Sequence, residues 1–251
     1  MKLRELLTEV NGSRETIGNL ETEIGALVTD SREKCENGLF FCIPGAKFDA
    51  HDFAPQSLEN GCVALVTARP LPALDCPQVV VENVRGAMAL IAGAFYGHAD
   101  RRMRLLGVCG TKGKTTTSYL LKSILEAAGI KAGLIGTTGN MIGRKHLHSN
   151  LTTPDPIDLH RCFRQMVDEG VEAVSMEVSA HAVAMRRLEG LQFEAACYTN
   201  LSQDHLDYFH TMQNYFETKK SFFMEGSVRN ASFNADDETS REIIRDIKIP
   251  Y

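Results

Sequence analysis

Residues 107–117 combine the residue types that bind phosphate groups. An apolar stretch leads into three glycines, three residues apart, and the last of them opens a Gly-Lys-Thr sequence at 113–115. Glycines in such a turn let backbone N–H groups point at phosphate oxygens, and the following helix adds its positive N-terminal end. Lys114 would supply a charge to the outer phosphates, and the Thr115 hydroxyl would ligate their Mg²⁺. The segment predicts a site for ATP or a similar triphosphate, formed by Gly110, Thr111, Lys112, Gly113, Lys114, Thr115 and Thr116.

The spacing of this segment departs from the Walker A sequence in one respect. Walker A has the form G-x-x-x-x-G-K-[ST], which would place a glycine where this chain has Val108. The glycine stands at Gly107 instead, so the loop is one residue longer than the common pattern. A glycine-rich turn between a strand and a helix that binds no ligand is the alternative, and the Gly-Lys-Thr sequence disfavours it.

From residue 104 onward, apolar strands alternate with amphipathic helices. This pattern is typical of βαβ crossovers and of a parallel sheet that is buried on both faces. The predicted strands lie at 104–109, 132–135, 171–178, 193–199 and 231–234, and the predicted helices at 114–128, 155–170, 180–188, 212–224 and 238–247. Ligands bind at the carboxyl ends of the strands in such sheets. Residues that directly follow a strand are therefore the candidates for chemistry.

The amino-terminal part of the chain has shorter elements. Its predicted strands lie at 24–28, 38–43, 62–66 and 79–81, and its predicted helices at 52–61 and 85–96. With 251 residues, the chain exceeds an average single domain. The sequence therefore predicts an α/β protein with a small α/β domain at 1–100 and a parallel-sheet domain of the P-loop ATPase type at 101–251.

Composition excludes several classes of protein. No apolar run is long enough to span a membrane, and the charged start of the chain does not resemble a signal peptide. The net charge of −5 is dispersed, with no basic face that would indicate nucleic-acid binding. Seven scattered cysteines without a C-x-x-C pair are typical of reduced thiols. We expect a cytoplasmic protein without a nucleic-acid partner.

Two polar clusters directly follow predicted strands. Glu177 ends a buried strand, where a carboxylate is costly unless it is paired or bound to a metal. It is a candidate Mg²⁺ ligand, with a plain salt bridge as an equal alternative. His205 lies between Asp204 and Asp207, an arrangement that would suit a metal. A surface helix start capped by Ser202 or Asp204 is the alternative, and spacing alone favours it.

Two other groups of ionisable residues allow a chemical or a structural role. His146 and His148 lie in a polar segment, 143–150, for which a solvated hairpin is favoured over a metal pair. Lys219 falls on the apolar stripe of the helix predicted at 212–224, whereas Lys220 points aside. A lysine that faces inward is either snorkelling or taking part in chemistry.

Together these motifs resemble the Mur ligases, the ATP-dependent amide-forming enzymes of peptidoglycan precursor synthesis. The similarity is strongest to the branch usually called MurE, which adds the third peptide residue to UDP-N-acetylmuramoyl-L-alanyl-D-glutamate. It runs from about residue 25 to about residue 240. The matching motifs are the loop at 107–115, Met-Glu-Val-Ser at 176–179, Asn-Leu-Ser-Gln-Asp-His-Leu-Asp-Tyr at 200–208, and Tyr-Phe-Glu-Thr-Lys-Lys-Ser-Phe-Phe at 215–223.

The resemblance also implies substrate contacts. The Asp-Ser-Arg sequence at 30–32, followed by Gly-Leu-Phe at 38–40 and by Gly45 and Asp49, is similar to the segment that holds the uridine end of the substrate. The domain at 1–100 would then bind the UDP-substrate and the domain at 101–251 would bind ATP. The substrate residues implied are Ser31, Thr152, Thr153, Ser179 and Arg187.

A mechanism follows from the resemblance. ATP would phosphorylate the D-glutamyl carboxylate, and an incoming amine would attack this acyl phosphate to form an amide. Phosphoryl transfer needs charge neutralisation and alignment more than covalent help. Lys114 would neutralise phosphate oxygens, and Lys219 would carry a carbamate that turns its cation into an anion. The implied Mg²⁺ ligands are Thr115, Glu177, His205 and the carbamylated Lys219, and the implied catalytic residues are Lys114, Glu177, His205 and Lys219.

The resemblance has three departures and leaves alternatives open. Met185 stands where some family members have a polar substrate contact. Lys112 occupies a position that is commonly Asn in the family. Family members continue beyond the position of Tyr251 to complete the central domain and add an amino-acid-binding domain, so we expect the 251-residue form to be inactive alone.

The sequence does not decide whether the added amino acid is diaminopimelate or lysine. The alternatives are a MurF-like or folate-polyglutamate ligase, or a nucleotide- or UDP-sugar-binding module without catalysis.

Overall fold

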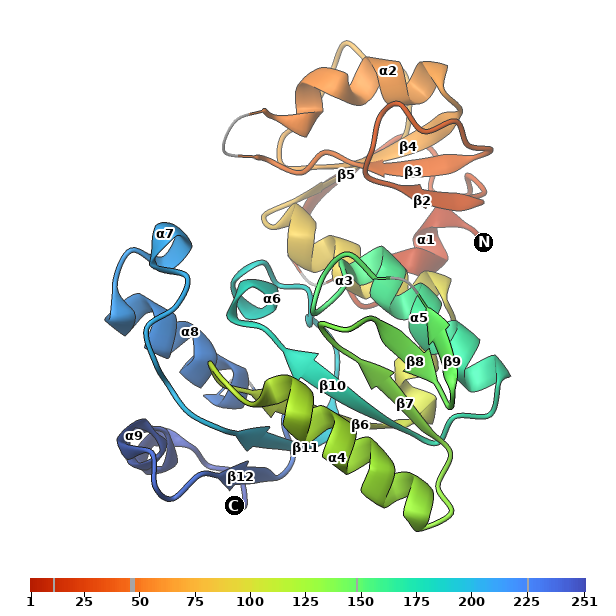
Figure 1. Ribbon diagram of the computed structural model, residues 1–251. Coiled ribbons are helices and arrows are strands. Elements are labelled where there is room, and N and C mark those ends of the chain that lie inside the picture. The colour runs from red at the N-terminus through yellow and green to blue at the C-terminus, as the bar shows by residue number, and fades with distance from the viewer. Residues whose placement is uncertain (11, 46–47, 148, 225) are drawn as a thin grey trace. The chain divides into compact units, whose positions relative to one another are not determined.

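The fold was analysed in a computed structural model, which describes every residue except 11, 46–47, 148 and 225. The chain divides into two compact units, Met1–Gly97 and His98–Tyr251. Each unit combines a largely parallel sheet with packed helices, so the predicted α/β class is confirmed (Figure 1).

The sheet of the first unit has the strand order β1-β5-β4-β3-β2 in its described residues. The strands are β1 (Ser13–Ile17), β2 (Ala26–Val28), β3 (Gly38–Phe41), β4 (Cys62–Thr67) and β5 (Gln78–Val81). The sequence did not predict β1, because four of its five residues are polar. It lies at the edge of the sheet, pairing antiparallel with β5 alone, whereas β2 to β5 pair parallel.

Helices cover both faces of this first sheet (Figure 1). They are α1 (Leu3–Leu6), the 3₁₀ turn η1 (Ala50–Phe53), α2 (Ala54–Glu59) and α3 (Val84–Phe95). Helix α2 packs on one face, and α1 and α3 lie on the other. The inner strands β3 and β5 are buried along their whole length, which explains their unbroken apolar sequences.

The sheet of the second unit has the strand order β12-β11-β6-β10-β7-β8-β9 among the described residues. The strands are β6 (Arg104–Cys109), β7 (Ala132–Ile135), β8 (Asn140–Ile142), β9 (Lys145–Leu147), β10 (Ala173–Val178), β11 (Phe193–Tyr198) and β12 (Ala231–Phe233). Neighbouring strands from β12 to β7 pair parallel, and β8 and β9 add an antiparallel hairpin. The turn and second strand of this hairpin lie in the segment 143–150 that was predicted to form one, β8 precedes that segment, and His148 lies outside the described residues.

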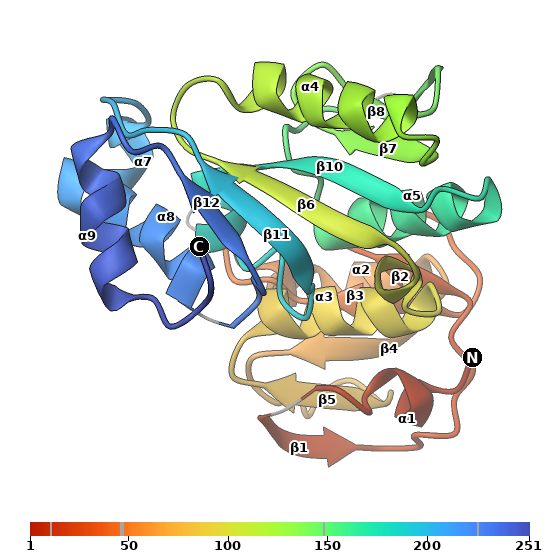
Figure 2. The ribbon, with the colours of Figure 1, turned by 90° about the horizontal axis from the view of Figure 1, so that it is seen from below.

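Helices also flank the second sheet. They are η2 (Ala99–Arg102), α4 (Lys114–Ala127), α5 (Pro156–Asp168), α6 (Ala180–Ala184), α7 (Leu206–Phe209), α8 (Met212–Met224) and α9 (Glu238–Asp246). Figure 2 shows α4 on one face of the sheet and α5 on the opposite face. The α5 face holds the main core, in which Phe163 and Phe222 pack with Phe193 of β11. Among the described residues, no helix is both long enough and apolar enough to cross a membrane.

One predicted helix is shorter in the structure. The sequence predicts a helix over 180–188, but α6 ends at Ala184. Arg186 takes a left-handed backbone, with φ 52°, which ends the helical path and turns the chain toward β11. The turn places Arg187 beside Thr153, and the Arg187 guanidinium donates to the Thr153 carbonyl at 2.9 Å.

Candidate functional site

The carboxyl ends of four parallel strands meet at one edge of the second sheet. Cys109, the last residue of β6, lies opposite Val178 of β10 and Tyr198 of β11. Strand β7 ends beside β10, where Ile135 pairs with Met176. The segments that follow these strands therefore lie side by side, and they contain most of the residues that the sequence singled out.

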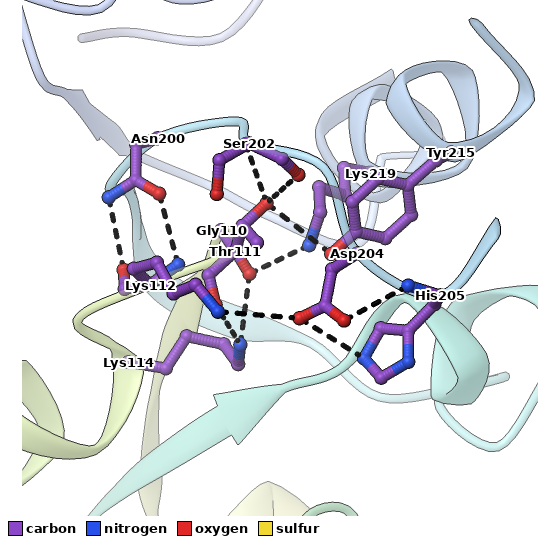
Figure 3. Close-up of polar contacts among 10 residues, drawn as sticks. All are labelled: Gly110, Thr111, Lys112, Lys114, Asn200, Ser202, Asp204, His205, Tyr215 and Lys219. Atoms are coloured by element: carbon purple, nitrogen blue, oxygen red, sulfur yellow. Dashed lines mark hydrogen bonds and ion pairs between the residues drawn. The ribbon is translucent and has the colours of Figure 1, made fainter. Parts of the chain in front are cut away.

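The glycine-rich loop after β6 is fixed by the segment after β11. Gly110 has φ 145°, and a Cβ there would lie 1.9 Å from the Thr199 hydroxyl oxygen, so this position excludes a side chain. The Asn200 side chain accepts from the Lys112 N–H at 3.0 Å and donates to the Lys112 carbonyl at 3.1 Å (Figure 3). Sequence analysis missed this role of Asn200, although it directly follows a predicted strand.

Thr111 joins the same loop to helix α8. Its hydroxyl accepts from the Ser202 N–H at 3.1 Å and lies 3.3 Å from the Tyr215 hydroxyl, to which it donates (Figure 3). The Thr111 N–H donates to the Asn200 carbonyl at 2.9 Å. Burial is the main cause that raises the pKa of Tyr215, so its hydroxyl keeps its proton at neutral pH. Tyr215 is thus a loop anchor as well as a core residue.

Two lysine side chains converge on a single backbone oxygen. The Gly110 carbonyl accepts from Lys114 Nζ at 3.0 Å and from Lys219 Nζ at 2.7 Å (Figure 3). Lys219 is 1% exposed, which confirms the prediction that it faces inward, and its Nζ lies 4.5 Å from the centre of the Tyr215 ring. Burial lowers the pKa of both lysines, and the charge of Lys219 lowers that of Lys114 further. Two cations held this close at the start of α4 favour an anion.

Glu177 is fully buried beside this loop edge. Its two carboxylate oxygens accept from the Thr137 N–H at 2.9 Å and from the Thr137 hydroxyl at 3.1 Å. A Cβ at Gly136 would lie 2.3 Å from the carboxylate, so the glycine makes room for it. No described residue forms an ion pair with Glu177, and Lys114 attracts it only from a longer range. The plain salt bridge that the sequence allowed is therefore not found.

The residues expected to contact the muramoyl peptide form one network around Thr153. The Thr153 hydroxyl donates to the Glu177 carbonyl at 2.9 Å and accepts from the Ser179 N–H at 3.1 Å. The Thr152 hydroxyl lies 3.0 Å from that of Thr137. Arg187 pairs with Asp155 at 2.8 Å. Thr152, Thr153, Ser179 and Arg187 thus lie next to Glu177, as neighbours of one sheet edge.

His205 lies at the start of α7 and corrects one expectation. Neither Ser202 nor Asp204 caps this helix: His205 itself holds the N-cap position, with a left-handed φ of 52°. Asp204 instead accepts from the His205 N–H at 3.0 Å and lies 3.7 Å from Lys112 Nζ. The His205 ring packs against His181, with ring centres 4.7 Å apart. Sequence analysis did not single out His181, which belongs to the segment after β10.

The side chains at this sheet edge supply part of a Mg²⁺ coordination sphere. Within the described part of the chain, no three or more His, Cys, Asp or Glu side chains gather as a metal group. The protein alone therefore offers no complete cage. Mg²⁺ commonly uses one or two carboxylates and takes its other ligands from phosphates and water. Glu177 is a buried carboxylate without a paired cation among the described residues and lies at the same sheet edge as the glycine-rich loop, which fits this mode of binding.

Ser31 lies in the first unit. Its side chain is 8% exposed, and its hydroxyl donates to the Gln56 side chain at 2.7 Å. Its carbonyl accepts from the Asn60 side chain at 2.8 Å. Asp30 and Arg32 beside it form a two-point ion pair. The uridine segment predicted from the sequence is therefore an ordered turn held against the end of α2.

Comparisons with known proteins agree with this geometry. Residues 108–250, more than half of the chain, match the family described as Mur ligase middle domain. The chain belongs to the Mur ligase family. One relative of this chain is the UDP-N-acetylmuramoyl-L-alanyl-D-glutamate–2,6-diaminopimelate ligase of Geobacillus thermodenitrificans, which is 45% identical over 96% of this chain and 50% of the relative. The corresponding ligase 1 of Clostridium acetobutylicum is 40% identical over all of this chain and 52% of the relative.

Solved structures show the same fold. A UDP-N-acetylmuramoyl-L-alanyl-D-glutamate–2,6-diaminopimelate ligase superposes with a TM-score of 0.83 at 26% identity, over 98% of this chain and 49% of that one. A MurF from Acinetobacter baumannii gives a TM-score of 0.68 at 22% identity, over 98% and 51% of the two chains. The chain spans about half the length of the curated relatives it matches.

Replacing Lys219 by Met should change how stability depends on pH. Because burial lowers the pKa of Lys219 in the folded chain, the unfolded chain binds more protons between that lowered pKa and the ordinary value of 10.5. The contribution of Lys219 to the free energy of unfolding therefore rises with pH in this window. In urea denaturation, the wild type should gain stability relative to Lys219→Met as the pH is raised toward 10.5.

Lys220→Met is the matched control, with the opposite sign. The hydrogen bond that Lys220 donates to Asp246 raises the pKa of Lys220, so the stabilisation by Lys220 is present below pH 10.5 and is lost as the pH rises through the folded pKa. Wild-type and Lys219→Met curves that run parallel over the whole pH range would contradict the interpretation of Lys219.

Proposed function

We propose that this chain carries the ATP-binding and carboxylate-activating site of a ligase of the MurE type. The substrate would be UDP-N-acetylmuramoyl-L-alanyl-D-glutamate, and the amino acid added would be diaminopimelate, as the names of the relatives suggest. The observation that carries this proposal is the convergence of Lys114 and Lys219 on the Gly110 carbonyl, beside the buried Glu177. This arrangement places two lysine side chains and one carboxylate at a single sheet edge.

The residues of the loop would bind and align the triphosphate. Gly110, Thr111, Lys112, Gly113, Lys114, Thr115 and Thr116 would surround the phosphates with backbone N–H groups and the N-terminal end of α4. Lys114 Nζ would turn from the loop carbonyls to the phosphate oxygens, a movement that its flexible side chain allows. Thr115, Glu177 and His205 would hold Mg²⁺, which when bound neutralises charge that develops on the transferred phosphoryl group.

The network around Thr153 would orient the substrate carboxylate. Arg187 and Ser179 are fixed by Thr153, whose own hydroxyl donates to the backbone of Glu177. These hydrogen bonds would therefore couple the position of Arg187 and Ser179 to that of strand β10, which carries Glu177. Such alignment matters because phosphoryl transfer to the carboxylate depends on in-line placement of the attacking oxygen. Ser31 of the first unit would contribute to binding of the uridine end.

Lys219 would act as a carbamate. Its neutral amine, favoured by burial, would attack the carbon of CO₂ to form an N–C bond and release a proton to solvent. The carbamate anion would then replace the ammonium and contribute to the Mg²⁺ site. With ¹³C-labelled bicarbonate, NMR should show a carbamate resonance that Lys219→Met loses and Lys220→Met keeps. No resonance in the wild type, or one that survives in Lys219→Met, would remove this role.

A binding panel tests the proposed substrate. Calorimetry with UDP-N-acetylmuramoyl dipeptide, the corresponding tripeptide and a folate should show the tightest binding for the dipeptide. Arg187→Ala should weaken this binding at least about tenfold, since lost hydrogen bonds to a charged group cost about 1.5–3 kcal/mol. Arg186→Ala is the matched control, because Arg186 pairs with Glu189 on the surface. Preference for the tripeptide would favour a MurF-like ligase, and preference for the folate would favour a folate ligase.

A further inference from the structure

Two thiols of the first unit lie in contact. Cys35 Sγ and Cys62 Sγ are 3.6 Å apart and share a hydrogen bond, although 27 positions separate the residues in the sequence. A disulfide joins its sulfurs at about 2.05 Å. The two sulfurs therefore need to approach by roughly 1.5 Å to bond.

Two glycines, Gly38 and Gly61, allow Cys35 and Cys62 to lie this close together. A Cβ at Gly38 would lie 2.4 Å from Cys35 Sγ and 2.8 Å from Cys62 Sγ, so both sulfurs use the space that this glycine leaves. A Cβ at Gly61 would lie 2.0 Å from the Cys35 carbonyl, so the two backbones touch there. The Cys35 N–H donates to the Asn60 carbonyl at 2.9 Å, which fixes Cys35 beside the start of β4.

The two thiols differ in access. Cys62 is 4% exposed, whereas Cys35 is partly exposed. Burial, followed by the hydrogen bond shared with Cys35, raises the pKa of Cys62 to about 12, so the Cys62 thiol is protonated at neutral pH. Cys35 is thus suited to react first with a small molecule, and Cys62 to react second inside the protein.

We propose that Cys35 and Cys62 form a reversible disulfide on exchange with a small-molecule disulfide, and that this bond ties residues 30–37 to β4. This segment contains Ser31, which already binds Gln56 and Asn60 next to β4. The inference goes beyond the proposed ligase function. It does not depend on that function, because the bond can be detected whether or not the chain binds a uridine nucleotide.

The thiol–disulfide exchange takes place in two steps. The Cys35 sulfur attacks the small-molecule disulfide, its S–S bond breaks, and one thiol leaves with the proton of Cys35. The Cys62 sulfur then attacks the Cys35 sulfur, the mixed disulfide breaks, and a second thiol leaves with the proton of Cys62. Two electrons pass from the protein thiols to the small-molecule disulfide, which ends as two thiols.

The test counts thiols in the folded chain after incubation with oxidised glutathione. Two of the seven thiols should be lost, and digestion should give a peptide that links Cys35 to Cys62. Cleavage at Lys34 and Glu36 separates Cys35 from Cys42, so the linkage can be assigned. A reductant should restore all seven thiols. Amide hydrogen exchange over residues 30–37 should be at least about tenfold slower in the oxidised chain.

Two variants control the assignment. Cys62→Ser should leave Cys35 as a mixed disulfide with glutathione and give no linked peptide. Cys76→Ser, which removes the other partly exposed thiol of the first unit, should still form the Cys35–Cys62 bond. The proposal is overturned if the wild type keeps seven thiols, if its Cys35 stops at the mixed disulfide, or if exchange over 30–37 is unchanged by oxidation.

Discussion

The parallel pairing of β6 with β10 on one side and β11 on the other is the constraint on which the site depends. It sets Val108 opposite both Glu177 and Cys197, so that the three strands end together. Each following segment must then turn within the same small region. For this reason the loop at 110–113 contacts Asn200, and the Thr137 segment contacts Glu177, although long stretches of chain separate these partners.

The burial of charged side chains at this sheet edge lowers the stability of the folded chain. Lys219 and Glu177 are both almost fully buried, and neither forms an ion pair with a described residue. A buried charge without a partner normally opposes folding. The structure offsets part of this cost with backbone hydrogen bonds: Gly110 accepts from both lysines, and the Thr137 N–H donates to Glu177. The part of this free-energy cost that is not offset is expected of a site that binds a charged ligand.

The sequence predicted the elements that have strong periodicity. Strand β6 and the start of α4 lie where the alternation of apolar residues placed them, and Lys219 faces inward as its position on the helix stripe implies. The edge strand β1 was missed because it pairs with a single strand, β5, and is made mostly of polar residues. Its sequence therefore shows no apolar pattern. The end of α6 was misplaced because the left-handed Arg186 carries no glycine signal.

Within the site, sequence reasoning found the charged groups and missed the groups that position them. Thr137, Asn200 and Tyr215 act through hydrogen bonds to segments far away in the chain, and no local pattern records such partners. The rule that residues after parallel strands line the site would have found two of them, Thr137 and Asn200. Tyr215 lies inside a helix, where its apolar ring explains its burial and conceals the role of its hydroxyl.

Calorimetric titration of the chain with Mg²⁺ and ATP tests the central claim most directly. If the lysines at the Gly110 carbonyl form a triphosphate site, Lys114→Met should weaken ATP binding at least about tenfold, or about 1.4 kcal/mol. Lys220→Met removes the same charge from a lysine that pairs with Asp246, and should leave the affinity close to that of the wild type. Equal affinities for the wild type and Lys114→Met would contradict the account.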